Sequence, residues 1–140
     1  MKYFRFVSLV VVISAGFCCC KPDKEEEQPA PVDPKSRFIA SWLCNETSNQ
    51  TGASAFNVHI VDSTGDYALI ENLYSMGFNT KVKAHISGDY INMVVPQNIN
   101  GKVILSGSGH LENSSTIKMK YVIDDGNPQK DSCSATLTKQ

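Results

Sequence analysis

Five cysteines are the residues of this chain whose spacing points most clearly to chemistry. Three of them are adjacent, at Cys18, Cys19 and Cys20, and they end a mostly apolar run that begins at Phe6. The run follows a positively charged start, as in an export signal. Because it is shorter than the roughly 20 apolar residues that a transmembrane helix needs, we expect a cleaved signal in preference to a retained membrane helix.

The cysteine triplet resembles a lipoprotein signal, in which the new N-terminal residue after cleavage is a cysteine that receives acyl chains. Such signals place a small residue before the cysteine and an apolar residue two positions further back. Cys20 fits best, with Cys19 in the small position and Phe17 in the apolar one, and Cys19 is the alternative anchor. Each buried CH₂ contributes about 0.8 kcal/mol, so several acyl chains make a stable attachment. The resemblance implies a signal peptide over residues 1–19 and a membrane anchor at Cys20.

The stretch after Cys20 predicts a disordered tether. Residues 21–35 hold four prolines and eight charged residues, a composition too poor in apolar side chains to fold. The segment from Lys24 to Glu27 reads either as a solvated linker or as a sorting signal, because it resembles the signal of Bacteroidetes-type lipoproteins on the outer face of the outer membrane. We expect an outer-membrane protein at the cell surface, with a periplasm-facing anchor as the alternative.

Charge excludes one class of partner. Removing the signal changes the net charge from −1 to −3, and a nucleic-acid-binding protein would need a basic patch. We therefore expect no nucleic-acid partner.

Cys44 and Cys133 remain as a pair in an exported chain, where disulfides persist. A disulfide between them would close a loop of about 90 residues and stabilise the fold by about 4 to 5 kcal/mol on the chain-entropy model. Two buried free thiols are the alternative. Neither cysteine has another cysteine or a histidine at ligand spacing, so we expect no metal and no other cofactor.

The other reactive side chains form no catalytic pattern. The three histidines lie on separate expected strands, and the adjacent Asp124 and Asp125 lie in a turn, where acidic residues are common. The Gly-Ser-Gly stretch at residues 107–109 lacks the lysine and the helix of a phosphate loop. We therefore predict that the protein is not an enzyme.

Residues 36–140 form one segment of a usual size for a single domain. Alternating apolar and polar positions predict half-buried strands throughout. The expected strands cover residues 38–46, 55–62, 67–73, 80–87, 91–95, 102–111, 117–123 and 133–138. Eight such strands joined by short turns predict an all-β fold, an antiparallel up-and-down meander that closes into a barrel.

Closure requires the first and last strands to pair antiparallel. The register that joins the two cysteines gives the pairs Cys44 with Cys133, Trp42 with Ala135 and Ala40 with Leu137. A large residue then meets a small one twice, and every paired residue lies on the apolar face. We expect this register, with the disulfide at the barrel seam.

The sequence Ala-Ser-Trp at residues 40–42 resembles the Gly-x-Trp signature that opens the first strand of lipocalins and other calycins. The stretches "VVPQNINGKVILSGSGHL", "TIKMKYVIDDG" and "CSATLTK" are similar to small lipocalin-like lipoproteins of Bacteroidetes. The resemblance covers nearly the whole domain and implies a lipocalin-like barrel. Alanine stands at the glycine position, and the basic residue that lipocalins stack on the tryptophan can here only be Lys139.

An apolar loop points to a binding function. The stretch "NLYSMGFNT" places Tyr74, Met76 and Phe78 in or beside a loop where polar residues are expected, and exposed apolar clusters often mark binding surfaces. We expect residues 73–78 to form a lid over the barrel mouth or, alternatively, a plug that belongs to the core. The expected ligand-binding residues are Trp42, Tyr74, Met76, Phe78 and Tyr121.

Two functions follow from this sequence. The first is a non-enzymatic lipoprotein that binds a small apolar or amphipathic molecule inside the barrel. The alternative is a module with a solid core that binds a protein or a glycan through its loops and outer face, as an adhesin or an inhibitor does. The sequence leaves open which ligand is bound, whether the barrel is hollow and whether the protein forms oligomers.

Overall fold

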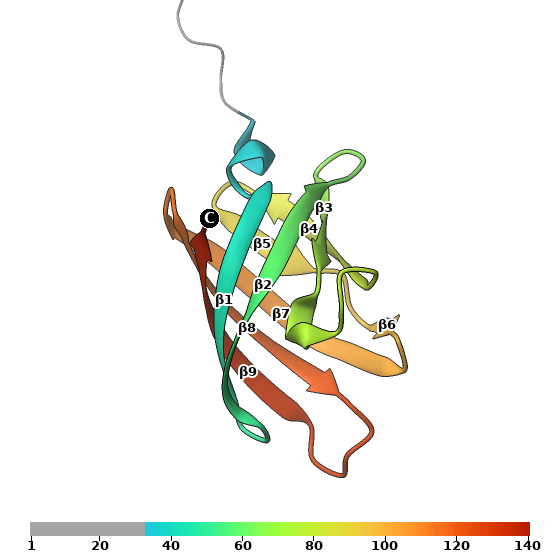
Figure 1. The fold of residues 1–140 in the computed structure, drawn as a ribbon. Helices are drawn as coiled ribbons and strands as arrows, with labels where there is room; N and C mark the ends of the chain where they lie inside the picture. Colours follow the sequence, from blue (N-terminus) through green and yellow to red (C-terminus); the bar gives the residue numbers. More distant parts are fainter. Residues whose placement is uncertain (1–32) are drawn as a thin grey trace, which may run out of the picture. The chain divides into compact units, whose positions relative to one another are not determined.

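The structure, a computed structural model, describes residues 33–140 (Figure 1). The chain elements in this range are η1 (Pro34–Arg37), β1 (Ala40–Ser48), β2 (Gly52–Asp62), β3 (Tyr67–Glu71), η2 (Leu73–Ser75), β4 (Lys81–Ser87), β5 (Tyr90–Met93), β6 (Gln97–Ile99), β7 (Lys102–Asn113), β8 (Thr116–Asp124) and β9 (Asp131–Lys139), where η marks a 3-10 helix. No helix among the described residues is long and apolar enough to span a bilayer. The predicted signal peptide, Cys20 and most of the predicted tether lie outside this range.

The strands form a closed antiparallel barrel (Figure 1). Strands β1 to β5 pair in sequence, and β7 to β9 do the same. Two further pairings, β5 with β7 and β9 with β1, close the ring. The short strand β6 adds to β7 beyond the end of β5. The predicted eight-stranded up-and-down barrel is confirmed, with β6 as an addition.

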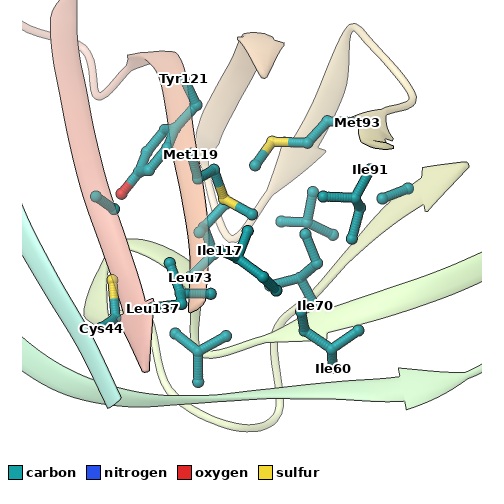
Figure 2. Packing of buried hydrophobic residues seen from close by; sticks show 14 of the residues in the cluster. Cys44, Ile60, Ile70, Leu73, Ile91, Met93, Ile117, Met119, Tyr121 and Leu137 are labelled. Carbon is teal, nitrogen blue, oxygen red and sulfur yellow. The ribbon is translucent and has the colours of Figure 1, made fainter. Parts of the chain in front are cut away.

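Alternation along each strand separates a buried interior from an exposed outer face. On β1, Trp42, Cys44 and Glu46 are buried, whereas Ser41 and Asn45 are exposed. Figure 2 shows the buried apolar side chains of different strands meeting in the interior. The largest fully buried side chains are Trp42, Tyr121, Phe38, Ile60, Ile70, Leu73, Ile91, Ile104, Ile117, Ile123, Leu137 and Val58. Full burial of one large apolar side chain stabilises a fold by about 1.5 to 3 kcal/mol, so this interior is the main source of stability.

Side chains fill the interior beside the glycines of β7. A Cβ added at Gly107 would lie 2.1 Å from Sδ of Met93, so the thioether occupies the space that a side chain would take. At Gly109 a Cβ would lie 3.0 Å from the carbonyl oxygen of Lys118 and 3.1 Å from Cγ2 of Ile91. The two glycines therefore let β7 approach its neighbours closely, as dense protein packing requires.

The predicted register at the barrel seam is wrong by four residues. Strands β1 and β9 do pair antiparallel, but Cys44 lies opposite Leu137, and Cys133 lies opposite Ser48. Four residues correspond to about 13 Å of strand, whereas a disulfide needs Cα atoms within about 7 Å. Cys44 and Cys133 are therefore separate buried thiols, and the disulfide predicted between them is absent.

In the observed register, Trp42 lies opposite Lys139. The Nζ atom of Lys139 is 5.4 Å from the centroid of the indole ring and donates a 3.3 Å hydrogen bond to the carbonyl oxygen of Arg37. The indole Nε1 of Trp42 donates to the carbonyl oxygen of Phe38 at 2.9 Å. Lys139 is thus the basic residue beside the tryptophan, as the resemblance implied. Its two contacts tie the end of β9 to Trp42 and Arg37, and the indole hydrogen bond ties Trp42 to the residues before β1.

The helical turn η1 begins inside the segment predicted as tether, which was expected to run to Lys35. Lys35 forms an ion pair with Asp62 at 2.6 Å and donates to the carbonyl oxygen of Ser63 at 2.9 Å. Arg37 forms an ion pair with Asp89 at 2.6 Å. These contacts join η1 to the β2–β3 and β4–β5 turns, so the folded domain includes the last residues of the predicted tether.

Backbone conformation explains why the third strand is shorter than predicted. The strand ends at Glu71 because Asn72 has a φ of 61°, in the left-handed region. Tyr74 and Ser75 follow with φ values of 55° and 54°. A chain in this conformation cannot continue a strand, and it turns into η2 instead.

The strand β6 was not predicted from the sequence. It forms a hairpin with β7 through Asn100 and Gly101, whose φ values are 52° and 81°. An Asn-Gly pair with positive φ at both positions is the preferred two-residue hairpin turn. The signal for this strand was therefore present in the sequence, although Pro96 indicated that strand structure ended there.

Candidate binding groove

The apolar loop after β3 covers the barrel interior. Leu73 is fully buried, and the hydroxyl of Tyr74 donates a 2.7 Å hydrogen bond to Oδ2 of Asp131 at the start of β9. The Tyr74 ring also meets the inward-facing Tyr121 ring edge to face, with 6.4 Å between the centroids. Because β3 and β9 are not neighbours in the sheet, these contacts run across the barrel. Residues 73–78 are thus held in the manner of a plug.

Asn72 fixes the shape of this loop. Its Nδ2 donates to the carbonyl oxygen of Asn57 on β2 at 2.7 Å, and its Oδ1 accepts from the amide of Gly77 at 2.6 Å. Met76 is half-buried and packs against the core. Phe78 is 45% exposed, and its ring centroid is 4.5 Å from that of His59. The loop therefore has apolar side chains on both sides, with Met76 facing the core and Phe78 facing outward.

Buried polar side chains lie beneath Tyr74. The Tyr121 hydroxyl donates to Oε2 of Glu46, and Ser48 Oγ donates to Oδ2 of Asp131 at 2.6 Å. Asp131 is fully buried, and its Oδ1 has no hydrogen-bond partner within the part of the chain that the structure describes. These residues were not predicted as a cluster. The sequence pattern that could have indicated part of the cluster is the alternation of buried and exposed positions along β1. This alternation continues past the expected end of the strand at Glu46, to Ser48.

The two buried carboxyl groups have pKa values shifted in opposite directions. Burial raises the pKa of Glu46, the hydrogen bond from Tyr121 lowers it in part, and the nearby charge of Asp131 raises it further. Burial alone would also raise the pKa of Asp131, but the hydrogen bonds from Ser48 and Tyr74 outweigh burial and hold it below the ordinary value. Asp131 is therefore the carboxyl that favours the ionised form.

The two cysteines of the folded domain, Cys44 and Cys133, have the features of unreactive thiols. Burial raises the pKa of Cys44 and of Cys133 to about 12, and the charge of Glu46 acts in the same direction. A thiol with this pKa is protonated at neutral pH, and the protonated form is a poor nucleophile and a poor metal ligand. Between residues 33 and 140, no three His, Cys, Asp or Glu side chains gather into an arrangement that could hold a metal ion.

A groove of about 930 Å³ lies on the outer face of the barrel. It crosses β2, β1, β9, β8, β7 and β5, which follow one another around the ring. Because the strands are about 4.8 Å apart, this crossing is about 24 Å long.

Two rows of outward-facing side chains form the walls of the groove. Each residue of a row lies opposite the next one on the neighbouring strand. The first row is Ala55, Asn45, Thr136, Lys118, His110 and Tyr90, and the second is Ala53, Thr47, Ser134, Lys120, Ser108 and Asn92. Between them, the backbone of inward-facing residues, including Met119 and Ala135, forms the floor.

The groove has a positively charged centre, although carbon atoms contribute more of its lining surface than polar atoms do. Hydroxyl or amide groups are carried by seven of the twelve side chains in the two rows, namely Asn45, Thr136, Tyr90, Thr47, Ser134, Ser108 and Asn92. Lys118 and Lys120 lie in the middle, and Nζ of Lys118 donates a 3.1 Å hydrogen bond to Oγ1 of Thr136. Glu46 is the one carboxylate among the lining residues, and it points into the barrel toward Tyr121.

The two ends of the groove differ. At the β5 end, Tyr90 is 60% exposed and its ring centroid lies 6.3 Å from that of His110, which gives an aromatic surface. At the β2 end, Ala53 and Ala55 provide short side chains. The groove therefore runs from an aromatic end through a charged centre to an open end.

None of the five predicted ligand-binding residues lines this groove. Trp42 and Tyr121 are buried in the interior, Tyr74 and Met76 belong to the covering loop, and Phe78 lies on the outside of that loop. The structure thus brings Tyr74 and Tyr121 together but places Trp42 near the other end of β1. Most groove residues occupy ordinary positions on predicted strands, whereas Thr47, Ala53, Ser54 and Tyr90 lie just beyond the predicted bounds. Only the register aligns them.

No protein-family model matches the chain, and the search of curated proteins gave no match. Among solved structures, the chain is similar to a redesigned beta barrel, b11L5F_LGL, with a TM-score of 0.56 and 16% identity over 76% of this chain and 95% of that chain. It is also similar to EF1p2_mFAP2b bound to DFHBI, with a TM-score of 0.56 and 13% identity over 75% of this chain and 95% of that chain. At these identities the likeness shows the barrel fold alone.

Proposed function

We propose that this chain is a non-enzymatic binding protein that holds an extended ligand, either a glycan or a protein segment, in the groove on its outer face. The observation that carries the proposal is the groove itself, which has a volume of about 930 Å³ and crosses six neighbouring strands. Ligand sites typically have volumes of about 300 to 1,000 Å³. In the barrel interior, in contrast, the Met93 side chain occupies the space beside Gly107, and Trp42 and Tyr121 are among the large side chains buried there.

The closed barrel favours binding at this groove. Except for Ala53 and Ala55 on β2, the side chains of both rows stand on strand segments that are paired on both sides, so their positions are fixed before a ligand arrives. A preorganised surface avoids part of the ordering cost of association. The groove can therefore bind without a change in backbone structure.

A bulky residue placed in the groove tests the proposal. Ser134→Trp fills the middle of the second row from an outward position on β9, and Thr138→Trp makes the same change on the same strand and face, about 13 Å away. We expect the wild-type protein and Thr138→Trp to bind the same members of an array of glycans and proteins. Ser134→Trp should lose this binding at least tenfold, and unchanged binding by Ser134→Trp would contradict the proposal.

Binding of a small apolar or amphipathic molecule inside the barrel is the second candidate. It is supported by the fold that the chain shares with the mFAP2b barrel, which is described as bound to DFHBI. Oδ1 of Asp131, which has no hydrogen-bond partner in the described part of the chain, also offers an acceptor for a ligand beneath Tyr74. Native mass spectrometry after gentle purification separates the candidates, because an interior ligand adds a constant mass and an empty barrel does not.

The location of the protein is part of the proposal. The cysteine triplet and the acidic segment behind it support an outer-membrane lipoprotein anchored at Cys20 with the domain at the cell surface. Cys20→Ser should abolish incorporation of labelled fatty acid and release the domain from the membrane. Protease treatment of intact cells should remove the domain, and a domain that survives while known surface proteins are cleaved would favour the periplasmic face.

A further inference from the structure

We propose that the ligand of the groove is an anionic polysaccharide, whose carboxylate or sulfate groups bind Lys118 and Lys120. This inference rests on the proposed function, because it requires the groove to be the binding site. It adds the chemical class of the ligand, which we argue from the charge of the groove, its donors and acceptors, its backbone and its aromatic end.

The charge of the groove is opposite in sign to that of the chain. The whole chain has a net charge of −1, yet the two central lysines lie next to each other on outward positions of β8. The carboxylate of Glu46 does not neutralise them from within the groove, since that side chain is 4% exposed and bonded to Tyr121. A lysine ammonium forms charge-assisted hydrogen bonds with carboxylate and other oxyanions. The centre of the groove therefore favours a ligand with negative groups.

The walls of the groove suit sugar hydroxyls. Hydroxyl groups such as those of Ser108 and Ser134, and amides such as that of Asn92, both donate and accept hydrogen bonds. Sugar hydroxyls have the same dual character, so they can pair with such a wall at many points.

A peptide has fewer ways to bind here. Extended peptides commonly bind by adding a strand to an open sheet edge, where backbone groups are unpaired. The groove lies on the face of the sheet. Its central strands β1, β9, β8 and β7 are paired with neighbours on both sides, whereas β2 pairs only with β1 between Gly52 and Val58. A peptide backbone would therefore find no ladder to extend beside Lys118 and Lys120, whereas a polysaccharide needs only the side chains.

The aromatic end supports the same class. Tyr90 is 60% exposed and lies beside His110, at the end of the row that contains Lys118. The C–H face of a sugar ring packs on such an aromatic surface, and the apolar ring gains from the area removed from water. The crossing of about 24 Å also has the shape for several linked units of a chain.

The experiment measures affinity for four polymers with the full-length chain purified in detergent. Dextran sulfate and polygalacturonate are the anionic polysaccharides, dextran is the neutral counterpart, and polyglutamate is an acidic peptide. The groove variant is Lys118→Gln with Lys120→Gln. The matched control is Lys81→Gln with Lys83→Gln, which removes the same charge at the same spacing from exposed positions on β4, outside the groove.

We expect at least one anionic polysaccharide to bind at least tenfold more tightly than dextran and polyglutamate. The groove variant should lose about tenfold or more of this affinity, as loss of charge-assisted hydrogen bonds implies, and the control pair should stay within about twofold. Tyr90→Ala should weaken the polysaccharide and leave polyglutamate unchanged. Equal binding of polyglutamate, equal binding of dextran, or no effect of the groove variant would overturn the inference.

The failure of the inference differs from the failure of the proposed function. If Ser134→Trp abolishes binding of a neutral glycan or a protein while no anionic polysaccharide binds, the groove is the site and only the ligand class is wrong. If Ser134→Trp has no effect on any bound ligand, the proposed function is wrong and the inference is overturned with it.

Discussion

Tyr74, in the loop after β3, donates a 2.7 Å hydrogen bond to Asp131 at the start of β9. The contact fastens the covering loop to β9, across the barrel from β3. The other oxygen of this buried carboxylate has no hydrogen-bond partner among residues 33–140. The relationship explains why the apolar loop predicted as part of a binding site is held against the core. The groove on the outer face is an open concave surface, and we propose it as the site.

Tyr74→Phe removes this hydrogen bond and keeps the ring. The loss of a buried hydrogen bond to a charged acceptor should lower the free energy of unfolding by about 1.5 to 3 kcal/mol, measured by urea denaturation. Tyr90→Phe is the control, because Tyr90 is 60% exposed, and it should change stability by less than about 0.5 kcal/mol. Equal stability of both variants would show that the loop is not fastened through Asp131.

Glu46→Gln should stabilise the protein at neutral pH. The pKa of Glu46 is raised in the folded state, so its contribution to stability is full below its ordinary pKa of 4.5 and is lost as pH rises through the folded value. The carboxamide keeps an acceptor for Tyr121 and avoids the buried charge. Its advantage over the wild type should therefore be present at pH 7 and disappear below pH 4.5.

Urea denaturation at a series of pH values checks this prediction. Glu112→Gln on β7 is the control, because Glu112 is exposed and should show no such pH-dependent gain. If the free energy of unfolding of Glu46→Gln exceeds that of the wild type by the same amount at every pH, ionisation of the Glu46 carboxyl does not destabilise the fold.

Gly107→Ala should destabilise the barrel by about 1 to 3 kcal/mol, because the added methyl would overlap the Met93 thioether. Truncation of the thioether should relieve the overlap. The double variant Gly107→Ala with Met93→Ala should therefore be more stable than the sum of the two single effects predicts. Additive effects in thermal unfolding would indicate that the two residues do not meet.

Cys44 and Cys133 should both behave as free, protected thiols. In a chain with Cys18, Cys19 and Cys20 replaced by serine, a thiol reagent at pH 8 should react slowly with the folded protein and with two thiols once it is unfolded. Burial and a pKa of about 12 give the same expectation. Addition of a reductant should leave the Tm unchanged, and a lower Tm with reductant would show that a disulfide had formed.

Alternation of apolar and polar residues was sufficient to predict the barrel. It identified the main strands because each has one buried and one exposed face. It could not fix the register of β1 against β9, since a shift by four residues leaves the same side chains facing inward. The contact between Trp42 and Lys139 identifies the observed register, and it depends on the chain ends meeting in space.

The candidate groove could not be predicted for a related reason. Asn45, Ser108 and Ser134 are ordinary polar residues on exposed strand faces. They form the walls of a groove only when several strands align in the observed register. Apolar residues in a loop, such as Tyr74 and Met76, gave the stronger sequence signal. The apolar character of these residues reflects their packing against the core. A loop that covers a core is as apolar as a loop that binds a ligand, so the sequence could not separate the two.

Mapping a bound ligand by amide chemical shifts in NMR tests the central claim most directly. The labelled protein is titrated with the tightest ligand found among the glycans and proteins of the array. We predict that the largest shifts cluster along the groove, at Ser108, Lys120 and Ser134. The largest shifts at Tyr121, Asp131 and residues 73–78 would place the ligand inside the barrel and contradict the account.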